Sequence, residues 1–340
     1  MKNNQINFFK SLAAELFKIR YPQKREKDKL ILNKLEKQIT KKGKANIKFK
    51  NPLPEKNVFY ELTTARNRNL ITQKEQGKLQ KTVVGFFGMS VGSHAALTWM
   101  MESRADLIKI ADPDTIDSSN LNRLRFGWDV VGQYKIDVVK KLLSEINPYA
   151  KIVKTSVVDD QTIEALLIKN KKVNIIVDAI DDLKGKIFLR KLCKDYKLPL
   201  ISAADVGDNV VVDIERYDLD PDYSFFHNRI PEIEKINLET INPLEKKNLI
   251  IKLVGFEHNS EKMLNSLMSI GKTIPTWPQL GATATIAGGV VTTLIKKIVL
   301  GEKVLSGRYY LSLDDLFVQD YNSKSRQLGR KKLIKTINQD

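Results

Sequence analysis

The stretch from Thr82 to Ala203 alternates short apolar runs with longer amphipathic ones. The apolar runs, which we expect to be strands, are TVVGFF, LIKIA, KIVKT, VNIIVDA and PLISA. We expect helices between them at 91–102, 133–147, 161–169 and 183–196. Alternation at this spacing is typical of an α/β fold with a doubly wound, mostly parallel sheet. Ligands bind such sheets at the carboxyl ends of the strands, so the functional residues should gather there.

The regions on either side of this core predict a different organisation. Residues 1–50 predict one or two basic helices, with Phe8, Phe9, Leu12, Ala13, Leu16 and Phe17 on one face. Thr72 and Glu75 form a plausible capping box before a short helix. We expect five parts. They are a basic helical segment at 1–58, an arginine arm with a short helix at 59–80, and a Rossmann-like domain at 81–216. A substrate-side region with an apolar helix and a terminal strand follows at 217–321, and a basic flexible tail at 322–340.

The net charge of +17 belongs mainly to the ends of the chain. Residues 1–58 hold 16 Lys or Arg against 5 Asp or Glu, which leaves +11, and the tail after Tyr321 adds six basic residues against one acidic. Such runs are more often solvated faces than binding sites, so RNA is a possible but secondary partner. The segment from Leu280 to Leu300 is apolar but includes Lys296 and Lys297, which disfavours a membrane span. With no secretory pattern at the start, we expect a cytoplasmic protein.

The first expected strand runs into the glycine-containing turn FFGMSVGSHAAL, which opens a helix. Such a turn lets backbone N–H groups approach phosphate oxygens without obstruction from side chains. The pattern is degenerate, because Gly88 and Gly92 are present while Met89 and Ser90 stand where more glycines are expected. Gly88, Ser90 and Gly92 are candidate phosphate-binding residues, and an ordinary turn between a strand and a helix is the alternative.

An acidic residue ends the second expected strand. Asp112 follows Gly92 by twenty residues, where a carboxylate can accept hydrogen bonds from ribose hydroxyls. A dinucleotide dehydrogenase fits equally well up to this point. An enzyme that displaces pyrophosphate must also neutralise the negative charge that grows on it, and Asn120, Arg123 and Lys135 follow on the same side of the sheet. This favours ATP over NAD.

Three carboxylates follow the fourth expected strand in VDAIDD. Asp178, Asp181 and Asp182 offer oxygen atoms beside the expected phosphate site, an arrangement that suits Mg²⁺. For Asp182 the alternative is a helix cap. We favour Asp181 as the metal ligand.

Several of these segments together resemble the ThiF and MoeB family of adenylating enzymes, which are related to ubiquitin-activating enzymes. The matching pieces are VVGFFGMSVG, ADPDTIDSSNLNR, VGQYK, INPYAKI and VDAIDD, and the pair SNLNR and GQYK is quite specific. TARNRNL followed by KEQGKL resembles the arginine arm that precedes the family's nucleotide domain. The resemblance covers some 160 residues well, from about Lys81 to Asp218 with the arm before it.

The resemblance implies roles for individual residues. Asp112 would bind ribose, with Asp114 beside it in the same segment, and Asn120, Arg123 and Lys135 would contact the phosphates of ATP. Asp181 would bind Mg²⁺ and be essential. In relatives that form homodimers, arginines like Arg66 and Arg68 reach the phosphates of the partner. The implied reaction is attack of a carboxylate on the α-phosphate of ATP, which gives an acyl adenylate and pyrophosphate.

The acyl substrate stays open at this stage. The leading hypothesis is the C-terminus of a small ubiquitin-like or sulfur-carrier protein, or of a peptide, and activation of a carboxylate on modified tRNA is an alternative. A nucleotide-binding scaffold without turnover is a third, and a dehydrogenase comes last. Cys193 is the one cysteine and is expected in the core, which disfavours a zinc site or an enzyme-bound thioester. His94, His227 and His258 are expected to be structural or solvated rather than catalytic.

Overall fold

A seven-stranded mixed sheet forms the centre of the protein. The computed structural model describes residues 2–24, 28–41, 43, 47, 49–238, 240–256 and 259–337. The strands in chain order are β1 (Val84–Phe87), β2 (Leu107–Ala111), β3 (Lys151–Thr155), β4 (Ile175–Asp178), β5 (Pro199–Val206), β6 (Asn209–Arg216) and β7 (Gly307–Ser312). Their order across the sheet is β3-β2-β1-β4-β5-β6-β7. The predicted Rossmann-like fold is confirmed, and each of the five expected strands is present.

The order of the strands reverses between β1 and β4. β1 pairs in parallel with β2 on one side and with β4 on the other. The chain therefore adds β2 and β3 on one side of β1 and the later strands on the other. A reversal of this kind opens a crevice at the carboxyl ends of the two strands. β6 and β7 are antiparallel additions beyond β5, and the sequence pattern did not reveal β6.

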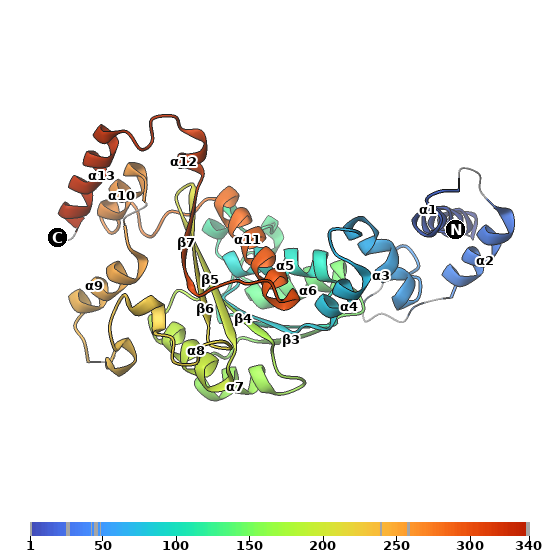
Figure 1. The fold of residues 1–340 in the computed structure, drawn as a ribbon, viewed down its shortest axis with the longest axis horizontal. Helices are drawn as coiled ribbons and strands as arrows, with labels where there is room; N and C mark the ends of the chain where they lie inside the picture. The colour runs from blue at the N-terminus through green and yellow to red at the C-terminus, as the bar shows by residue number, and fades with distance from the viewer. Residues whose placement is uncertain are drawn as a thin grey trace.

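Helices cover both faces of the sheet. One face packs against α5 (Val91–Ser103), α6 (Lys135–Ile146) and α11 (Gly281–Leu300), whose buried residues join those of β1 in one apolar core. The other face packs against α7 (Asp160–Ile168) and α8 (Leu183–Tyr196). Figure 1 shows the sheet between these two layers, with α11 and α5 side by side. The predicted bounds of these helices agree with the structure to within two residues.

α11 is the one described helix that is long and apolar enough to cross a membrane by length and composition. It packs against α5, β5 and β6, with seven of its residues buried in the core. At Gly288 the two helices approach so closely that an added Cβ would lie 2.6 Å from His94 Cβ. α11 therefore serves here as a core helix.

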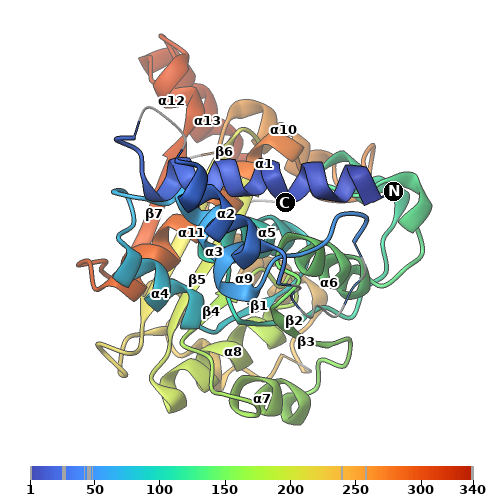
Figure 2. The ribbon, with the colours of Figure 1, turned by 90° about the vertical axis from the view of Figure 1, so that its right-hand side faces the viewer.

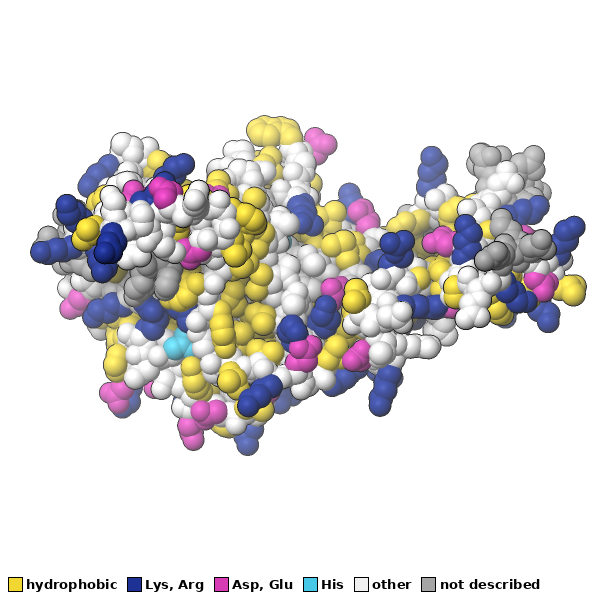
Figure 3. Space-filling model, turned by 45° about the horizontal axis from the view of Figure 1, so that its top comes forward, with side chains coloured by type: hydrophobic (Ala, Val, Ile, Leu, Met, Phe, Trp, Pro, Cys, Tyr) yellow, Lys and Arg dark blue, Asp and Glu magenta, His cyan; other side chains and the backbone are white. Residues whose placement is uncertain are grey.

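The N-terminal helices α1 (Lys2–Arg20) and α2 (Lys29–Ile39) lie at one end of the molecule and pack on α3 (Lys56–Thr64), as Figures 1 and 2 show. Leu16 and Phe17 are buried between them, as the predicted apolar face of α1 requires. α3 crosses the predicted boundary at residue 58. The predicted capping box, Thr72 with Glu75, begins α4 (Gln73–Lys81) and is confirmed. Lys and Arg side chains are spread over this end of the surface in Figure 3.

The region after β6, apart from α11 and β7, consists of loops and short helices, which its weak periodicity predicts. It forms α9 (Pro243–Val254), α10 (Glu261–Ser269) and α12 (Leu313–Phe317), with 3₁₀ turns at Phe225–Asn228 and Ile233–Lys235. Within the basic tail, expected to be flexible over 322–340, the described residues form α13 (Lys324–Ile337), and residues 338–340 lie outside the described residues. Ile337 packs with Leu264 of α10 in a small apolar cluster, which a composition count could not reveal.

The α5–α11 contact predicts opposite effects for two neighbouring glycines. Gly288→Ala places a methyl group against the backbone of α5 and should destabilise the protein by about 1–3 kcal/mol. Gly289→Ala, with nothing within 4 Å of the new Cβ, should stabilise it by about 0.5–1 kcal/mol through helix propensity. Urea denaturation followed by circular dichroism measures both. Equal midpoints for the two variants would contradict the close packing.

Candidate nucleotide-binding site

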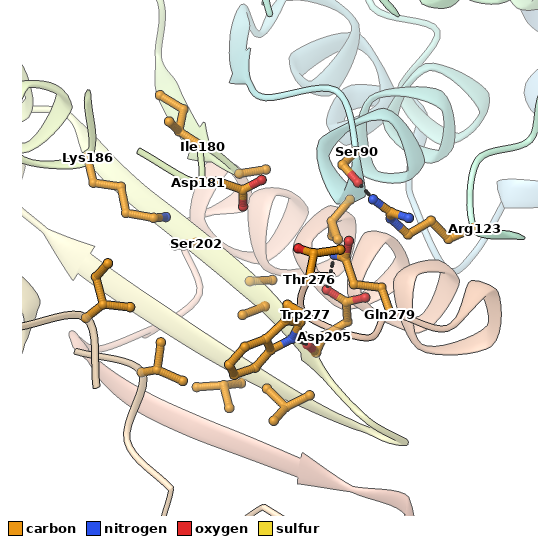
Figure 4. A pocket seen from close by; sticks show the side chains of 18 of the residues that line it. Ser90, Arg123, Ile180, Asp181, Lys186, Ser202, Asp205, Thr276, Trp277 and Gln279 are labelled. Atoms are coloured by element: carbon orange, nitrogen blue, oxygen red, sulfur yellow. Dashed lines mark hydrogen bonds between the residues drawn. The ribbon is translucent and has the colours of Figure 1, made fainter. Parts of the chain in front are cut away.

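A cavity of about 980 Å³ lies at the carboxyl ends of β1, β4 and β5, at the reversal point of the sheet. The loop at 274–279, α9 and β7 close its other side. Figure 4 shows the Ser90–Arg123 pair on one wall, Asp181 with Lys186 on another and Asp205 with Gln279 opposite. Of the site residues predicted from the sequence, those that line this cavity are Ser90, Asp114, Asn120, Arg123, Lys135 and Asp181. Gly88, Gly92, Asp112, Arg66 and Arg68 do not line it.

The two predicted glycines bring the turn after β1 against the turn after β4. Gly88 has φ +89°, and a Cβ there would lie 2.1 Å from the carbonyl oxygen of Ala179. At Gly92 an added Cβ would lie 3.2 Å from Ala179 Cβ. No other residue fits at Gly88 without moving the end of β4. This contact thus places Ser90, which follows Gly88, and Asp181, which follows Ala179, around one cavity.

Asp112 is buried at the end of β2 and braces this turn. Its Oδ2 accepts a hydrogen bond from Met89 N at 2.5 Å, and its Oδ1 accepts one from Asp114 N at 2.8 Å. Lys135 Nζ lies 4.0 Å from Oδ1. Burial raises the pKa of Asp112, although Lys135 and the two backbone donors oppose that rise. In this structure the carboxylate fixes the glycine turn to the segment that follows β2, and ribose binding stays a prediction.

Lys135 begins α6 and is held toward the same segment. Its side chain is buried, and Nζ donates to Asp114 Oδ2 at 2.7 Å. The Lys135 N–H also donates to Asp114 O at 3.0 Å. Asp114 itself is largely exposed toward the cavity. A buried ammonium beside an open carboxylate can exchange that partner for a phosphate oxygen at little cost in geometry.

Arg123 is positioned from three sides. Its Nε donates to Ser90 Oγ at 3.2 Å, and its Nη1 donates to Asn122 Oδ1 at 3.1 Å. The buried ring of His94 contacts the Arg123 carbonyl oxygen at 2.6 Å, consistent with the predicted packing role of this histidine. Asn122 also donates to Gln279 O at 2.8 Å, which connects this segment to the loop before α11. The guanidinium therefore lies beside the glycine turn.

The predicted Asn120 is oriented by a local turn. It belongs to the 3₁₀ turn Ser118–Asn122, where Asn120 Oδ1 accepts a hydrogen bond from Asp117 N at 3.1 Å. Its side-chain N–H groups are therefore the part left to face a ligand, which suits contact with phosphate oxygens.

Asp178, at the end of β4, is a structural anion. It lies 2.8 Å from Arg190 Nη1 and 3.2 Å from Lys186 Nζ, and Arg190 also donates to the buried Glu215. Burial alone would raise the pKa of Asp178, but the two cations outweigh it and hold the pKa below its ordinary value. The expectation that Asp178 joins a three-carboxylate metal site is wrong, because its oxygens are already occupied.

The other two carboxylates of VDAIDD separate into different roles. Asp182 Oδ2 accepts a hydrogen bond from Gly185 N at 2.8 Å and caps α8, so the capping alternative is confirmed. Asp181 is exposed within the cavity. Among the described residues, no group of three or more His, Cys, Asp or Glu side chains is arranged to hold a metal ion. Asp181 is left as the single candidate ligand from this motif.

The arginine arm lies outside the cavity. Arg68 donates to Ile19 O at 2.7 Å and lies 3.3 Å from Glu61, which ties the arm to α1 and α3 of the same chain. Arg66 is exposed in the 3₁₀ turn Ala65–Asn67. A role for these arginines at a partner's site stays a prediction.

Cys193 and His227 are both engaged in the structure. Cys193 is fully buried, and burial raises its pKa well above the ordinary value, so it is a core thiol rather than a nucleophile. His227 Nε2 lies 2.9 Å from Asp213 Oδ1, and its Nδ1 lies 2.9 Å from Tyr223 Oη. Burial would raise the pKa of Asp213, but hydrogen bonds from His227 and Arg308 hold it far below the ordinary value. His258 lies outside the described residues.

Residues that the sequence pattern did not single out complete the cavity. Lys186 follows the Asp182 cap by one helical turn, a spacing that could have placed it beside the end of β4. Asp205 lies at the end of β5, two residues beyond the predicted strand. Trp277 and Gln279 come from a loop whose sequence carries no periodic signal, so only the fold brings them here.

The fold and this cavity define a doubly wound α/β protein with a cavity at the switch point of the sheet. A family model described as ThiF family matches residues 64–332. The chain therefore belongs to the ThiF family, and its relatives include adenylyltransferases.

Three relatives illustrate the family. An uncharacterized protein of Mycobacterium tuberculosis, MT1398, is 29% identical over 251 residues, or 74% of this chain and 34% of the relative. A tRNA threonylcarbamoyladenosine dehydratase of Bacillus subtilis is 28% identical, over 46% of this chain and 64% of the relative. A molybdopterin-synthase adenylyltransferase of Escherichia coli is 28% identical, over 36% and 48%. The chain thus spans less than two thirds of the length of each.

The fold is also similar to that of solved structures. The crystal structure of E. coli MccB with AMPCPP and MccA matches with a TM-score of 0.52 and 18% identity, over 89% of this chain and 85% of the other. At this identity the likeness supports the fold alone.

Asp178, the last residue of β4, and Asp181, in the loop that follows, should affect stability differently when mutated. Asp178→Asn leaves Arg190 buried with a weakened partner and should destabilise the protein by about 3 kcal/mol. Asp181→Asn, exposed in the cavity, should change stability by less than about 0.5 kcal/mol. Urea denaturation at neutral pH without added metal measures both. Equal stability of the Asp178→Asn variant and the parent protein would contradict the structural role.

Proposed function

We propose that this protein is an ATP-dependent adenylyltransferase that activates a carboxylate as an acyl adenylate. The observation that carries the proposal is the meeting of Arg123, Lys135 and Asp181 in one cavity at the switch point of the sheet. Membership of the ThiF family and the adenylyltransferase among its relatives support the same chemistry. The size of the cavity, about 980 Å³, leaves room for a nucleotide and part of an acyl substrate.

In this reaction a carboxylate oxygen forms a bond to the α-phosphorus of ATP. The bond between that phosphorus and the oxygen bridging to the β-phosphorus breaks, and pyrophosphate leaves with the electron pair. Negative charge therefore grows on the leaving group, and fixed cations that wait for it lower the barrier. Arg123 and Lys135 supply two such cations, each held in place by neighbours before a ligand arrives.

The other predicted residues take roles around the nucleotide. Asn120 would donate to a phosphate oxygen, and Ser90 with the N-terminus of α5 would face the phosphates. Asp112 and Asp114 would lie toward the ribose. Asp114 would release Lys135 as the phosphates arrive, which frees its carboxylate for a ribose hydroxyl.

Magnesium fits this site through Asp181. Mg²⁺ is commonly held by one or two carboxylates, several waters and the phosphates of a substrate, so a single aspartate meets the requirement. Bound there, Mg²⁺ would neutralise phosphate charge. Lys186 lies near Asp181 in Figure 4 and is paired with Asp178, so Asp181 keeps its carboxylate facing the cavity.

The substrate that we favour is the C-terminal carboxylate of a small protein or peptide. A ubiquitin-activating enzyme and an adenylyltransferase and sulfurtransferase are among the relatives, and MccB, which is similar in fold, is solved with MccA. We also propose a homodimer in which Arg66 and Arg68 of one copy approach the site of the other. Since Arg68 is held by Ile19 and Glu61 in the single chain, dimer formation would have to release it.

Removing the charge of Asp181 or of Arg123 should abolish or slow the adenylation step. Asp181→Ala should abolish ATP–pyrophosphate exchange stimulated by candidate C-terminal peptides, and Arg123→Ala should reduce its rate by about 100-fold or more. Circular dichroism and unfolding should show an intact fold for both variants. Asp182→Ala, which removes only a helix cap, is the matched control and should keep its exchange activity. Full activity of Asp181→Ala would disprove the mechanism.

Activation of a carboxylate on modified tRNA is the second candidate, favoured by the dehydratase relative and by the basic N-terminal helices. If the N-terminal segment binds tRNA, affinity should fall steeply as salt rises from about 50 to 200 mM, because phosphate contacts release counterions. Filter binding with bulk tRNA measures this, with a protein lacking residues 1–50 for comparison. If the full chain retained no tRNA on the filter at low salt, this candidate would be excluded.

A further inference from the structure

Asp205 is a buried carboxylate that the adenylation mechanism does not use. It ends β5, lines the cavity and is only 4% exposed. Its Oδ1 accepts a hydrogen bond from Gln279 Nε2 at 2.9 Å. Its Oδ2 has no hydrogen-bond partner among the described residues. A carboxylate at this depth ordinarily has both oxygens satisfied, so the open acceptor needs an explanation.

The surroundings of Asp205 make the open oxygen costly. Burial raises the pKa of Asp205 and the nearby Asp181 adds to the rise, while Gln279 and Arg123 act in the opposite direction. Asp181 and Arg123 line the same cavity as Asp205. A buried acceptor without a donor destabilises the protein. A ligand group that donates a hydrogen bond there would recover that energy on binding.

The loop before α11 gives this carboxylate a wall and an orientation. Trp277 Nε1 lies 3.4 Å from Asp205 O, and its ring joins Val206 and Met263 in an apolar cluster. Gln279 O accepts a hydrogen bond from Asn122, the residue before Arg123. Figure 4 shows Asp205, Trp277 and Gln279 gathered on one side of the cavity, across from Asp181. Oδ2 is shielded from solvent in this conformation, and rotation about the Cβ–Cγ bond of Asp205, a soft torsion in aspartate, would exchange the positions of the two oxygens.

We propose that Asp205 accepts a hydrogen bond from an N–H group carried by the α-carbon of the activated carboxylate, and so selects amino-acid or peptide carboxylates over simple carboxylic acids. The inference rests on the proposed adenylation, because it places the acyl group between Asp181 and Asp205. An N–H on the α-carbon is the nearest donor that such a substrate carries. A carboxylic acid with an ester oxygen or a carbon in that position, which carries no donor, leaves the Asp205 oxygen unpaired.

Non-hydrolysable acyl-adenylate analogues test this inference without knowledge of the natural substrate. Three sulfamoyl adenosines are compared with AMP by titration calorimetry. One carries N-acetylglycine, one carries glycine, and one carries the acetyl ester of glycolic acid, which has oxygen in place of the N–H. The proteins are the full chain, Asp205→Ala and Asp208→Ala. Asp208 is an exposed aspartate in the turn after β5 that does not line the cavity, so it is the matched control.

We expect the N–H analogues to bind the parent protein and Asp208→Ala about tenfold more tightly than the ester, and Asp205→Ala to lose that preference. Preference for the N-acetylglycyl analogue indicates a peptide C-terminus, and preference for the glycyl analogue indicates a free amino acid. Equal binding of the ester to the parent protein would overturn the role of Asp205 while leaving adenylation intact. If no analogue bound more tightly than AMP, the adenylation proposal itself would fail, and this inference with it.

Discussion

The close approach of the turns after β1 and β4 determines where every other part of the site lies. Gly88 brings its backbone against Ala179, at a distance that no side chain permits. Because β1 and β4 are neighbours at the reversal point of the sheet, this contact fixes the glycine turn beside the residues that follow Asp178. Ser90 and Asp181 then face one cavity. The glycine that resembles a phosphate-binding residue thus acts in this structure through strand-end packing.

Buried carboxylates connect the pieces that this contact assembles. Asp112 binds the backbone of the glycine turn and of the segment after β2, with Lys135 nearby. Asp178 anchors the start of α8 through Lys186 and Arg190. Each is an anion with its donors already in place, so it orients neighbours at small cost in reorganisation. Arg123 and Lys135, which line the cavity, are likewise held by neighbouring side chains before any ligand binds, as the proposed electrostatic role requires.

The local sequence pattern predicts the parallel core of the fold. It does not predict contacts between residues that lie far apart in the sequence. The strands β1 to β5 and their helices follow from apolar periodicity, and Ser90, Arg123, Lys135 and Asp181 follow from strand ends and spacing. Partners were not predictable in that way. The metal hypothesis for Asp178 failed because Arg190 is twelve residues away on a helix that folds back against it. The contact of Ile337 with α10 likewise has no local signature in the sequence.

The loop before α11 shows why the acyl side of such a site is harder to read than its nucleotide side. The proposed nucleotide contacts come from strand ends, which periodicity locates, whereas Trp277 and Gln279 reach the cavity only because α11 packs on α5. Gln279 contacts both Asp205 and the Arg123 segment, so it joins the acyl side to the phosphate side. Asp205 Oδ2 is buried without a donor, which lowers the stability of the folded protein. The fold itself does not need an unpaired carboxylate at this position. The lost stability is recovered only when a ligand supplies the missing donor, which makes binding selective for groups that carry one.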